Sequence, residues 1–348
     1  MRHSIAAACA MALAVSLLSG CAEKAAVTAG APAPAEVITI SDDIPLTTAP
    51  VPTAAPTKEP EWDEAALWSA LSELVFSFSS GAGGWGTELY IDSDGSFWGT
   101  YHDSDMGDTG EGYPNGTLYL CRFSGSFAAS EASADGAVRL SVENLRCLRS
   151  EGEEILDGVR VIYSEPYGLT GDGRFTLYPP TARRGSLSEE ALSWIRWVQG
   201  DPAYSEDQLG FYALCNESEQ QVFSSMRLSA DGLAVRRRIS EAIHTAAPLE
   251  DRLRQDLSQT ELNLTSGELY DIWDSALNDV WLLLKASLDS DTFQHLTADE
   301  LAWIDAKEAA VHAASDIYRE GSIYPLIFHT TAADWTQNRL FELSGWIH

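Results

Sequence analysis

The sequence has little positive charge. Its 348 residues include 22 Lys and Arg against 52 Asp and Glu, which gives a formal net charge of −30. A surface this negative repels nucleic acid and anionic headgroups and attracts cationic partners. We therefore predict no nucleic-acid partner. Two interpretations of the charge stay open: an acidic coat that only keeps the protein soluble, or a surface that binds a basic protein.

The motifs of common enzymes and metal sites are also missing. There is no G-x-S-x-G, no H-E-x-x-H, no P-loop, and no G-x-G-x-x-G that opens a helix after a strand. No C-x-x-C or cysteine/histidine cluster is present, which argues against structural zinc. We therefore predict no catalytic residue, no cofactor and no enzymatic activity.

The N-terminal apolar run, Ile5 to Leu18, is shorter than the roughly 20 residues that span a bilayer. It follows Arg2 and is typical of a signal peptide, here residues 1–20. The run ends in "LSGC", which resembles the bacterial lipobox and implies acylation of Cys21. The alternatives are an ordinary cleaved signal with an incidental cysteine, and a short buried helix.

Residues 21–60 predict a disordered linker. They are rich in Ala, Pro and Thr, contain seven of the 14 prolines and lack aromatic residues. Such a segment cannot bury enough apolar surface to fold, and proline keeps it extended. Two or more acyl chains on one cysteine anchor a protein stably. We expect a lipid-anchored protein on the extracytoplasmic face of the cell membrane.

Three cysteines remain for the folded part after Cys9 and Cys21 are assigned to the N-terminal segment: Cys121, Cys147 and Cys215. Three thiols allow one disulfide at most. The sequence leaves open which two cysteines pair, or whether any do.

Residues 61–225 predict a β-rich domain. Segments such as "TLYLCRF" (117–123) are rich in β-branched and aromatic residues and are separated by Gly/Asp/Asn clusters. "AVRLSVENL" (137–145) alternates apolar and polar residues, as in a sheet buried on one face. "DSDGS" (92–96) is typical of a hairpin turn. We expect an antiparallel sheet or small barrel, followed by one helix over 188–198.

Residues 250–348 predict a short antiparallel helical bundle, reached through a connector at 226–249, so that the chain is an α+β multidomain protein. Apolar residues recur at steps of three and four over 266–289, which predicts a helix with one buried face. That stripe contains Leu269, Trp273, Leu277, Val280, Leu284 and Leu288.

Two further helices are predicted in the same block. The first covers 297–318, with Thr297 and Glu300 as a capping box, and the second covers 330–347. We expect Trp303 to be buried with Trp273. The predicted buried stripes contain Leu301, Ile304, Val311 and Tyr318 in the first helix, and Leu340, Leu343 and Ile347 in the second.

Four segments of this block carry a family resemblance: "QTELN" (259–263), "LYDIWDSALNDVWLLL" (269–284), "L-x-x-D-E-L-A-W-I-D-A-K-E" (296–308) and "T-x-x-R-L-x-E-L" (336–343). Over about residues 255–345 they resemble the N-terminal domain of the LprI-type lysozyme-inhibitor lipoproteins. Residues 61–225 resemble no characterised family.

Asn278 and Trp303 are the best-matching positions of the resemblance. It implies binding of a basic protein such as lysozyme. Family members usually carry two cysteines where this chain has Thr265 and Val311. The disulfide that the resemblance implies is therefore absent, and apolar packing must hold the helices.

The stretch "HDSDMGDTGEG" (102–112) is the one candidate metal site, with Asp103, Asp105, Asp108 and Glu111 as its carboxylates. The spacing does not fit an EF-hand, because glycine and glutamate do not fall at positions 6 and 12 of the loop. A looser calcium or sugar site and a solvated loop both remain open. Two functions stay open: a lipoprotein that binds a basic protein and inhibits lysozyme, and one whose β-domain binds a small molecule, a sugar or a wall component.

Overall fold

The computed structural model describes residues 62–347, apart from 131, 134, 150, 157 and 200–206. The predicted signal peptide, linker and lipid site Cys21 lie outside this range. No helix of the described part is long and apolar enough to cross a membrane.

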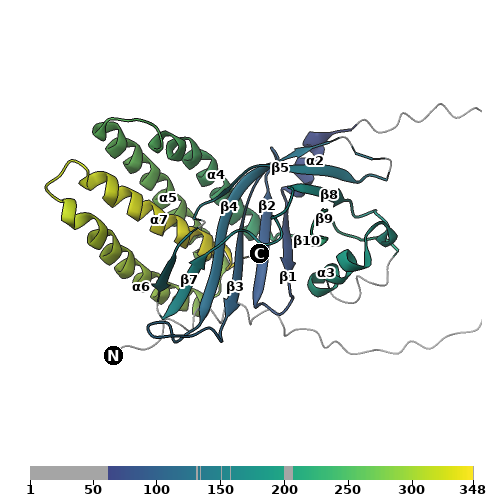
Figure 1. Ribbon diagram of the computed structural model, residues 1–348, viewed down its shortest axis with the longest axis horizontal. Coiled ribbons are helices and arrows are strands. Elements are labelled where there is room, and N and C mark those ends of the chain that lie inside the picture. Colours follow the sequence, from purple (N-terminus) through teal and green to yellow (C-terminus); the bar gives the residue numbers. More distant parts are fainter. Residues whose placement is uncertain are drawn as a thin grey trace, which may run out of the picture.

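Eight antiparallel strands close into a barrel (Figure 1). The order around the barrel is β1-β2-β3-β4-β5-β8-β9-β10, and β10 pairs back onto β1. This confirms the predicted antiparallel barrel. The strands are β1 (Leu74–Ser79), β2 (Trp85–Ile91), β3 (Ser96–Asp105), β4 (Thr117–Ala129), β5 (Val138–Cys147), β8 (Arg174–Tyr178), β9 (Ala213–Asn216) and β10 (Gln221–Arg227).

A short hairpin extends the sheet beyond the barrel. Its strands are β6 (Glu153–Leu156) and β7 (Val159–Tyr163), and β7 pairs in parallel with the first residues of β4. The rest of β4 pairs with β5, after a register shift between Ser124 and Ser126. β4 therefore belongs to the barrel along its whole length and also carries the hairpin.

Aromatic side chains fill the barrel interior. Phe76, Phe97, Phe123 and Phe175 are almost completely buried in one cluster, in keeping with an eight-stranded barrel that is just wide enough for its own side chains. Gly99 permits this packing, since a Cβ there would lie 2.2 Å from the Glu88 carbonyl and 2.4 Å from the Phe123 ring.

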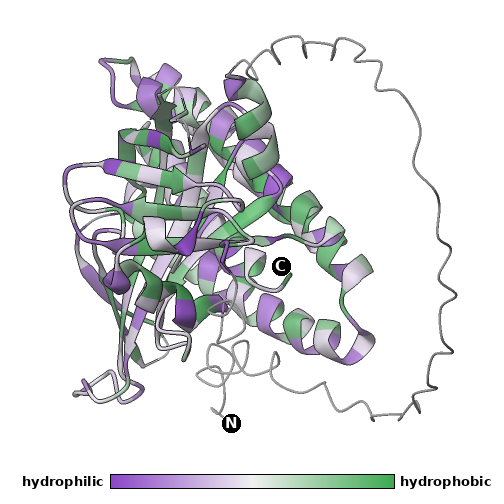
Figure 2. Cartoon of the chain, turned by 90° about the vertical axis from the view of Figure 1, so that its right-hand side faces the viewer, coloured by the Kyte–Doolittle hydropathy of each residue, from purple (hydrophilic) through white to green (hydrophobic). Residues whose placement is uncertain are grey.

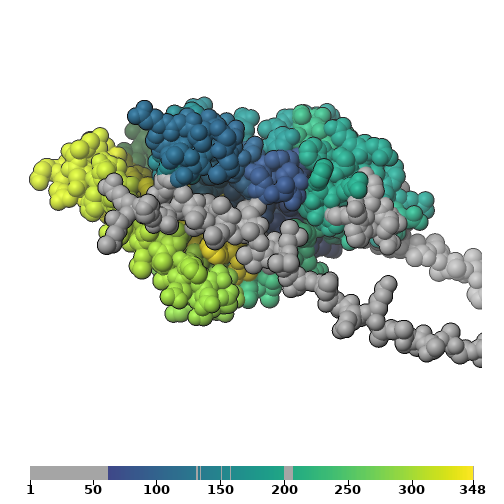
Figure 3. Space-filling view, turned by 90° about the horizontal axis from the view of Figure 1, so that it is seen from below, coloured from purple at the N-terminus to yellow at the C-terminus, as the bar shows by residue number. Residues whose placement is uncertain are grey.

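Four long helices follow the barrel, three of them in the predicted bundle and one, α4, largely in the segment predicted to be a connector. They lie on one side of the barrel in Figure 1 and beside it in the space-filling view (Figure 3), and α7 packs against α4, α5 and α6. The helices are α4 (Ala230–Leu253), α5 (Gln259–Ser287), α6 (Ser290–Ser315) and α7 (Tyr324–Ser344), with η3 (Asp316–Tyr318) before α7; α2 (Glu64–Leu71), η1 (Arg184–Ser186) and α3 (Glu189–Gln199) belong to the barrel part.

The segment expected to be a connector, 226–249, forms the end of β10 and most of α4. Val235 and Ile239 of α4 are buried in the same apolar cluster as Trp98 of the barrel. The helix continues for five residues beyond Pro248, although proline removes one hydrogen bond of the helix. Some residues of the barrel therefore share an apolar cluster with the helices, separate from the cluster that fills the barrel interior.

The predicted stripe of α5 is confirmed from Leu269 to Leu284, whereas Leu288 is half-buried. Hydrophobic and hydrophilic residues alternate along the helices (Figure 2). In α7, Leu340 and Leu343 are buried as predicted and Ile347 is half-buried.

The expectation for α6 was partly wrong. The helix begins at Ser290 with Asp289 as its N-cap, so Thr297 and Glu300 lie inside it and form no capping box. The burial stripe follows Leu296 and Val311, while Leu301 is 60 % exposed and Tyr318 is 40 % exposed. α6 packs mainly on α7. This contact buries a different face of α6 from the one that the spacing of its apolar residues suggested.

Candidate functional site

The segments that carried the resemblance meet between α6 and α7. Arg339 of α7 is buried and donates from Nε to Glu300 at 2.8 Å and from a terminal nitrogen to Asp299 at 2.6 Å. A further bond of 3.2 Å joins Arg339 to Glu342. These carboxylates raise the pKa of Arg339 against the opposing effect of burial. The network fixes α6 on α7.

Trp303 is half-buried at the same contact, so the prediction that it is fully buried was too strong. The Lys307 ammonium lies 4.9 Å from the centre of the Trp303 ring and 5.8 Å from that of Tyr270, within range of a cation–π contact. Asn278 is exposed and donates to the Asp274 carbonyl at 2.8 Å. Trp303 therefore contributes to packing, and Asn278 makes a hydrogen bond within α5.

Carboxylates gather around Tyr270 on the outer side of α5 and α6. Burial raises the pKa of Tyr270, and Asp274, Asp271 and Glu308 raise it further. Together with Glu268 of α5 and Asp305 of α6, which are exposed, these three carboxylates make up what we call the acidic face. It is a negative surface suited to a cationic partner.

The candidate metal carboxylates do not converge. Asp105 accepts hydrogen bonds from the backbone N–H groups of Gly107 and Asp108, which is the geometry of a capped turn. Asp108 accepts from Thr117 Oγ1 at 2.8 Å, and Glu111 is exposed. No group of three potential metal ligands is present among the residues that the structure describes, Asp103 included. The described residues therefore give the metal interpretation of this stretch no support, and they fit the alternative of a solvated loop.

The cysteines of the described residues are free thiols. Cys121 and Cys147 lie on the adjacent strands β4 and β5, and the interaction between their thiols lowers the pKa of Cys147 and raises that of Cys121. Cys215 is buried on β9, and burial raises its pKa to about 11.

One serine–histidine contact has to be considered as a nucleophilic site. Ser96 Oγ lies 2.9 Å from His244 Nε2, and Asp92 Oδ2 lies 4.0 Å from the same nitrogen. A catalytic triad needs its carboxylate on the other ring nitrogen, so that one nitrogen stays free to take the serine proton. The contact does not meet that requirement, and it joins the β2–β3 turn to α4.

A cleft of about 280 Å³ opens where β4 and β5 face α4, α5 and α7. Ile243, Leu253, Leu269 and Trp273 provide its apolar walls. Its polar lining includes Arg146, Glu250, Arg254, Asp334 and Gln337. No sequence pattern predicts this cleft, because its residues come from five separate segments of the chain.

Two carboxylates in this cleft have raised pKa values. Burial raises the pKa of Glu250, Asp334 and Asp251 add to the effect, and Arg254 and Arg146 oppose it. Asp334 is exposed at the mouth of the cleft. Protein atoms around its carboxylate still exclude enough water to raise its pKa to about 6, and the charge of Arg149 opposes this rise. Perturbed carboxylates in a cleft are typical of functional sites.

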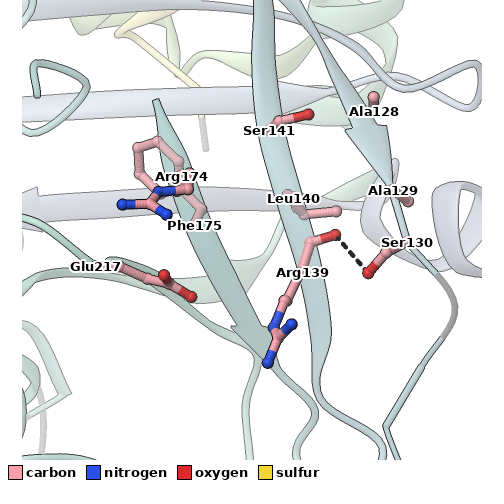
Figure 4. A pocket seen from close by; sticks show the side chains of 9 residues that line it. All are labelled: Ala128, Ala129, Ser130, Arg139, Leu140, Ser141, Arg174, Phe175 and Glu217. Carbon is pink, nitrogen blue, oxygen red and sulfur yellow. Dashed lines mark hydrogen bonds between the residues drawn. The ribbon is translucent and has the colours of Figure 1, made fainter. Parts of the chain in front are cut away.

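Figure 4 shows a second depression, of about 270 Å³, over β4, β5 and β8. Arg139, Arg174 and Glu217 lie at its edge. Arg174 is paired with Asp172 at 2.5 Å, and Glu217 accepts from Thr176 at 2.5 Å. Two of the three charged groups therefore already have partners, which makes this depression the weaker candidate.

Comparison with known proteins identifies the class of the helical part. Residues 251–343 match the model of a family of lysozyme inhibitors, described as "Lysozyme inhibitor LprI". This helical region is therefore similar to the LprI family, as the resemblance predicted, and it lies C-terminal to the barrel of this chain. No curated protein and no solved structure matches the chain significantly.

Proposed function

We propose that this chain is a membrane-anchored lipoprotein that binds a lysozyme outside the cytoplasm and inhibits it. The observation that carries the proposal is the match of residues 251–343 to the lysozyme-inhibitor family. The lipobox at Cys21 and the linker at 21–60 support anchoring, since an extended linker holds the folded part away from the membrane.

The acidic face is the surface that we assign to the partner. Glu268, Asp271, Asp305 and Glu308 project from α5 and α6, and none of them forms an ion pair within the described part of the chain. A basic lysozyme would be steered to such a face and held there by complementary charge. Because charge alone also attracts non-specifically, inhibition rather than binding is the decisive property.

The test compares two variants of the full chain with equal changes in charge. One neutralises the acidic face with Glu268→Gln, Asp271→Asn, Asp305→Asn and Glu308→Gln. The control neutralises four exposed glutamates of the barrel part, at 143, 189, 190 and 219. We expect the wild type and the control to inhibit lysozyme at 0.15 M salt, where the screening length is about 8 Å, and the face variant to inhibit at least about tenfold less, a 1.4 kcal/mol effect.

Equal inhibition by the two variants would contradict the assignment of the face. Loss of all binding by wild type at 0.15 M salt would contradict the inhibitor function itself, because non-specific attraction between exposed charges is largely screened there. Small-molecule binding inside the β-domain has less support, since aromatic side chains fill the barrel interior.

A further inference from the structure

Two cysteines of the barrel are close neighbours across one pair of strands. Cys147 is the last residue of β5 and lies opposite Phe123 of β4. The pairing continues by one residue, since the Leu148 N–H donates to the Arg122 carbonyl at 2.8 Å. Cys121 precedes Phe123 by two residues, so both side chains lie on the same face of β4. The two cysteines are therefore diagonal neighbours on one face of the sheet.

That face is the interior of the barrel. Cys121 is buried in the apolar cluster that fills the barrel, and Cys147 is half-buried against the same cluster. Diagonal neighbours lie about 7–8 Å apart, with their side chains closer, whereas a disulfide needs roughly 4.4–6.8 Å between the Cα atoms. Because Cys147 ends its strand, a small shift of that end brings the pair into disulfide range.

The third cysteine of the barrel lies elsewhere. Cys215 is on β9, and β5 and β8 separate β9 from β4 in the order of the sheet. Its thiol is buried in a different apolar cluster and donates to the Asn216 carbonyl at 3.7 Å. Among the residues that the structure describes, Cys121 and Cys147 are therefore the one pair of cysteines on adjacent strands.

The two thiols differ in their surroundings. The Cys147 thiol raises the pKa of Cys121, and burial raises it further. Interaction with Cys121 lowers the pKa of Cys147, against the opposing effects of burial and of the Glu165 charge. Cys147 is also the more exposed of the two and lines the cleft between barrel and helices. A reagent in solution therefore reaches Cys147 first.

We propose that Cys121 and Cys147 form a dithiol site that disulfide compounds oxidise to an intramolecular bond. The bond joins the end of β5 to β4 directly after Leu120, where the partner of β4 changes from β7 to β5. Disulfides persist outside the cytoplasm, which is where the proposed function places the chain. The inference itself needs only a disulfide as the oxidant.

The oxidation proceeds by two thiol–disulfide exchanges. The Cys147 thiolate attacks one sulfur of the external disulfide, whose S–S bond breaks and releases a first thiol. Cys121 then loses its proton and attacks Cys147 Sγ, which breaks the mixed disulfide and releases a second thiol. Two electrons pass from the two cysteines to the external disulfide, which is reduced to two thiols.

The test oxidises the full chain with oxidised glutathione, alkylates the remaining thiols under denaturing conditions and maps the tryptic peptides by mass spectrometry. Trypsin places the two cysteines on separate peptides, one ending at Arg122 and one covering 147–149, and Cys215 on a third; the two N-terminal cysteines fall on a fourth. We expect a bond between the first two peptides and an alkylated Cys215. Absence of this bond, or a bond to Cys215, would overturn the proposal.

Single variants test the order of the two steps. Cys121→Ser should keep one glutathione on Cys147 as a mixed disulfide, because no second thiol is present to displace it. Cys147→Ser should leave Cys121 reduced, since a buried thiol does not meet the reagent. Cys215→Ala is the matched control and should form the wild-type bond. Oxidation of Cys121 at the wild-type rate in the Cys147 variant would contradict the assigned order. Mapping of the wild type decides the pairing even if a variant fails to fold.

The melting temperature gives a second readout. A disulfide stabilises mainly by restricting the unfolded chain, so the oxidised wild type should melt at least about 5 °C higher than the same protein in dithiothreitol. Cys147→Ser should melt alike under both conditions. An oxidised protein that melts no higher than the reduced one would contradict a bond that fits the native barrel. Lysozyme enters none of these measurements, so this proposal and the inhibitor function stand or fall separately.

Discussion

Arg339 donates from Nε to the Glu300 carboxylate at 2.8 Å, across the contact of α7 with α6. Glu342 continues this link, since it also binds Arg122 of β4 at 3.3 Å. The chain of contacts therefore runs from α6 through α7 to the barrel. It explains why Glu300 and Arg339 can be buried although both are charged.

Arg339→Met should destabilise the fold strongly. Removing one partner of a buried ion pair leaves the other charge buried and typically costs about 3–5 kcal/mol. Arg319→Met, which removes an exposed pair with Asp316, should cost less than about 1 kcal/mol. The measurement is urea unfolding of the full chain. Equal unfolding midpoints for the two variants would show that the Arg339 network contributes little.

Asp334→Asn should stabilise the protein at pH 7.5 and have no effect at pH 4. The folded-state pKa of Asp334 is raised to about 6, above the roughly 3.9 of an unfolded Asp. The folded state then binds the proton more tightly, so the ionised carboxylate destabilises the fold above pH 6, and this cost disappears as the pH falls from 6 to 4.

The size of this effect is limited by exposure. Two pKa units correspond to roughly 2.7 kcal/mol, but solvent screening at an exposed group reduces the expected gain to below about 1 kcal/mol. Unfolding measured at both pH values gives the difference, and Asp305→Asn is the control. A gain at pH 4 as large as at pH 7.5 would contradict the assigned titration.

Trp273→Ala should cost about 3–5 kcal/mol, as aromatic truncations in cores do, because Trp273 is only 1 % exposed in the core shared by helices and barrel. Leu301→Ala is the comparison. It was predicted from spacing to be buried but is 60 % exposed, so it should stay within about 0.5 kcal/mol. Similar melting temperatures for the two variants would contradict the observed burial.

The sequence predicted the parts of the fold that depend on local periodicity. The stripe from Leu269 to Leu284 needs only the helical repeat, and the alternation in β5 needs only the strand repeat. Leu301 was misplaced because the face that α6 buries is set by its contact with α7. α4 was missed because Pro248 and its mixed charges resemble a linker, whereas the barrel residue Trp98 and its neighbours bury one side of it.

The candidate sites also differ in whether a sequence pattern marks them. Trp303 and its neighbours were identifiable because a family resemblance marks them. The cleft around Glu250 and Asp334 was not, since no local pattern tells a cleft carboxylate from the other acidic residues of so negative a chain. For the carboxylates at 103–111 the sequence left a metal site and a solvated loop open, because a turn that Asp105 caps has the same composition as a metal-binding loop.

Cys21→Ala should release the protein from membranes, since acylation needs the Cys21 thiol. Fractionation of cells that express the full chain measures this, and Cys9→Ala within the signal peptide is the matched control and should leave anchoring intact. If the Cys21 variant stays with the membranes as fully as wild type, the lipobox interpretation is wrong.

A cut between Leu249 and Glu250 should not yield two independently folded halves, contrary to what the predicted connector at 226–249 suggests. Trp98 of β3 donates to Ser240 of α4 at 2.9 Å and packs edge-on against Phe341 of α7 at 5.3 Å.

The contact with Phe341 would be lost on cutting, whereas Ser240 stays with Trp98 in the N-terminal fragment. Each large apolar side chain that the cut exposes would carry a penalty of about 1.5–3 kcal/mol. We expect the 250–348 fragment to melt without a cooperative transition when followed by circular dichroism. The 229–348 fragment retains α4 and separates its contribution from that of the barrel. Cooperative melting of the 250–348 fragment at the midpoint of the full chain would show that the shared core is dispensable.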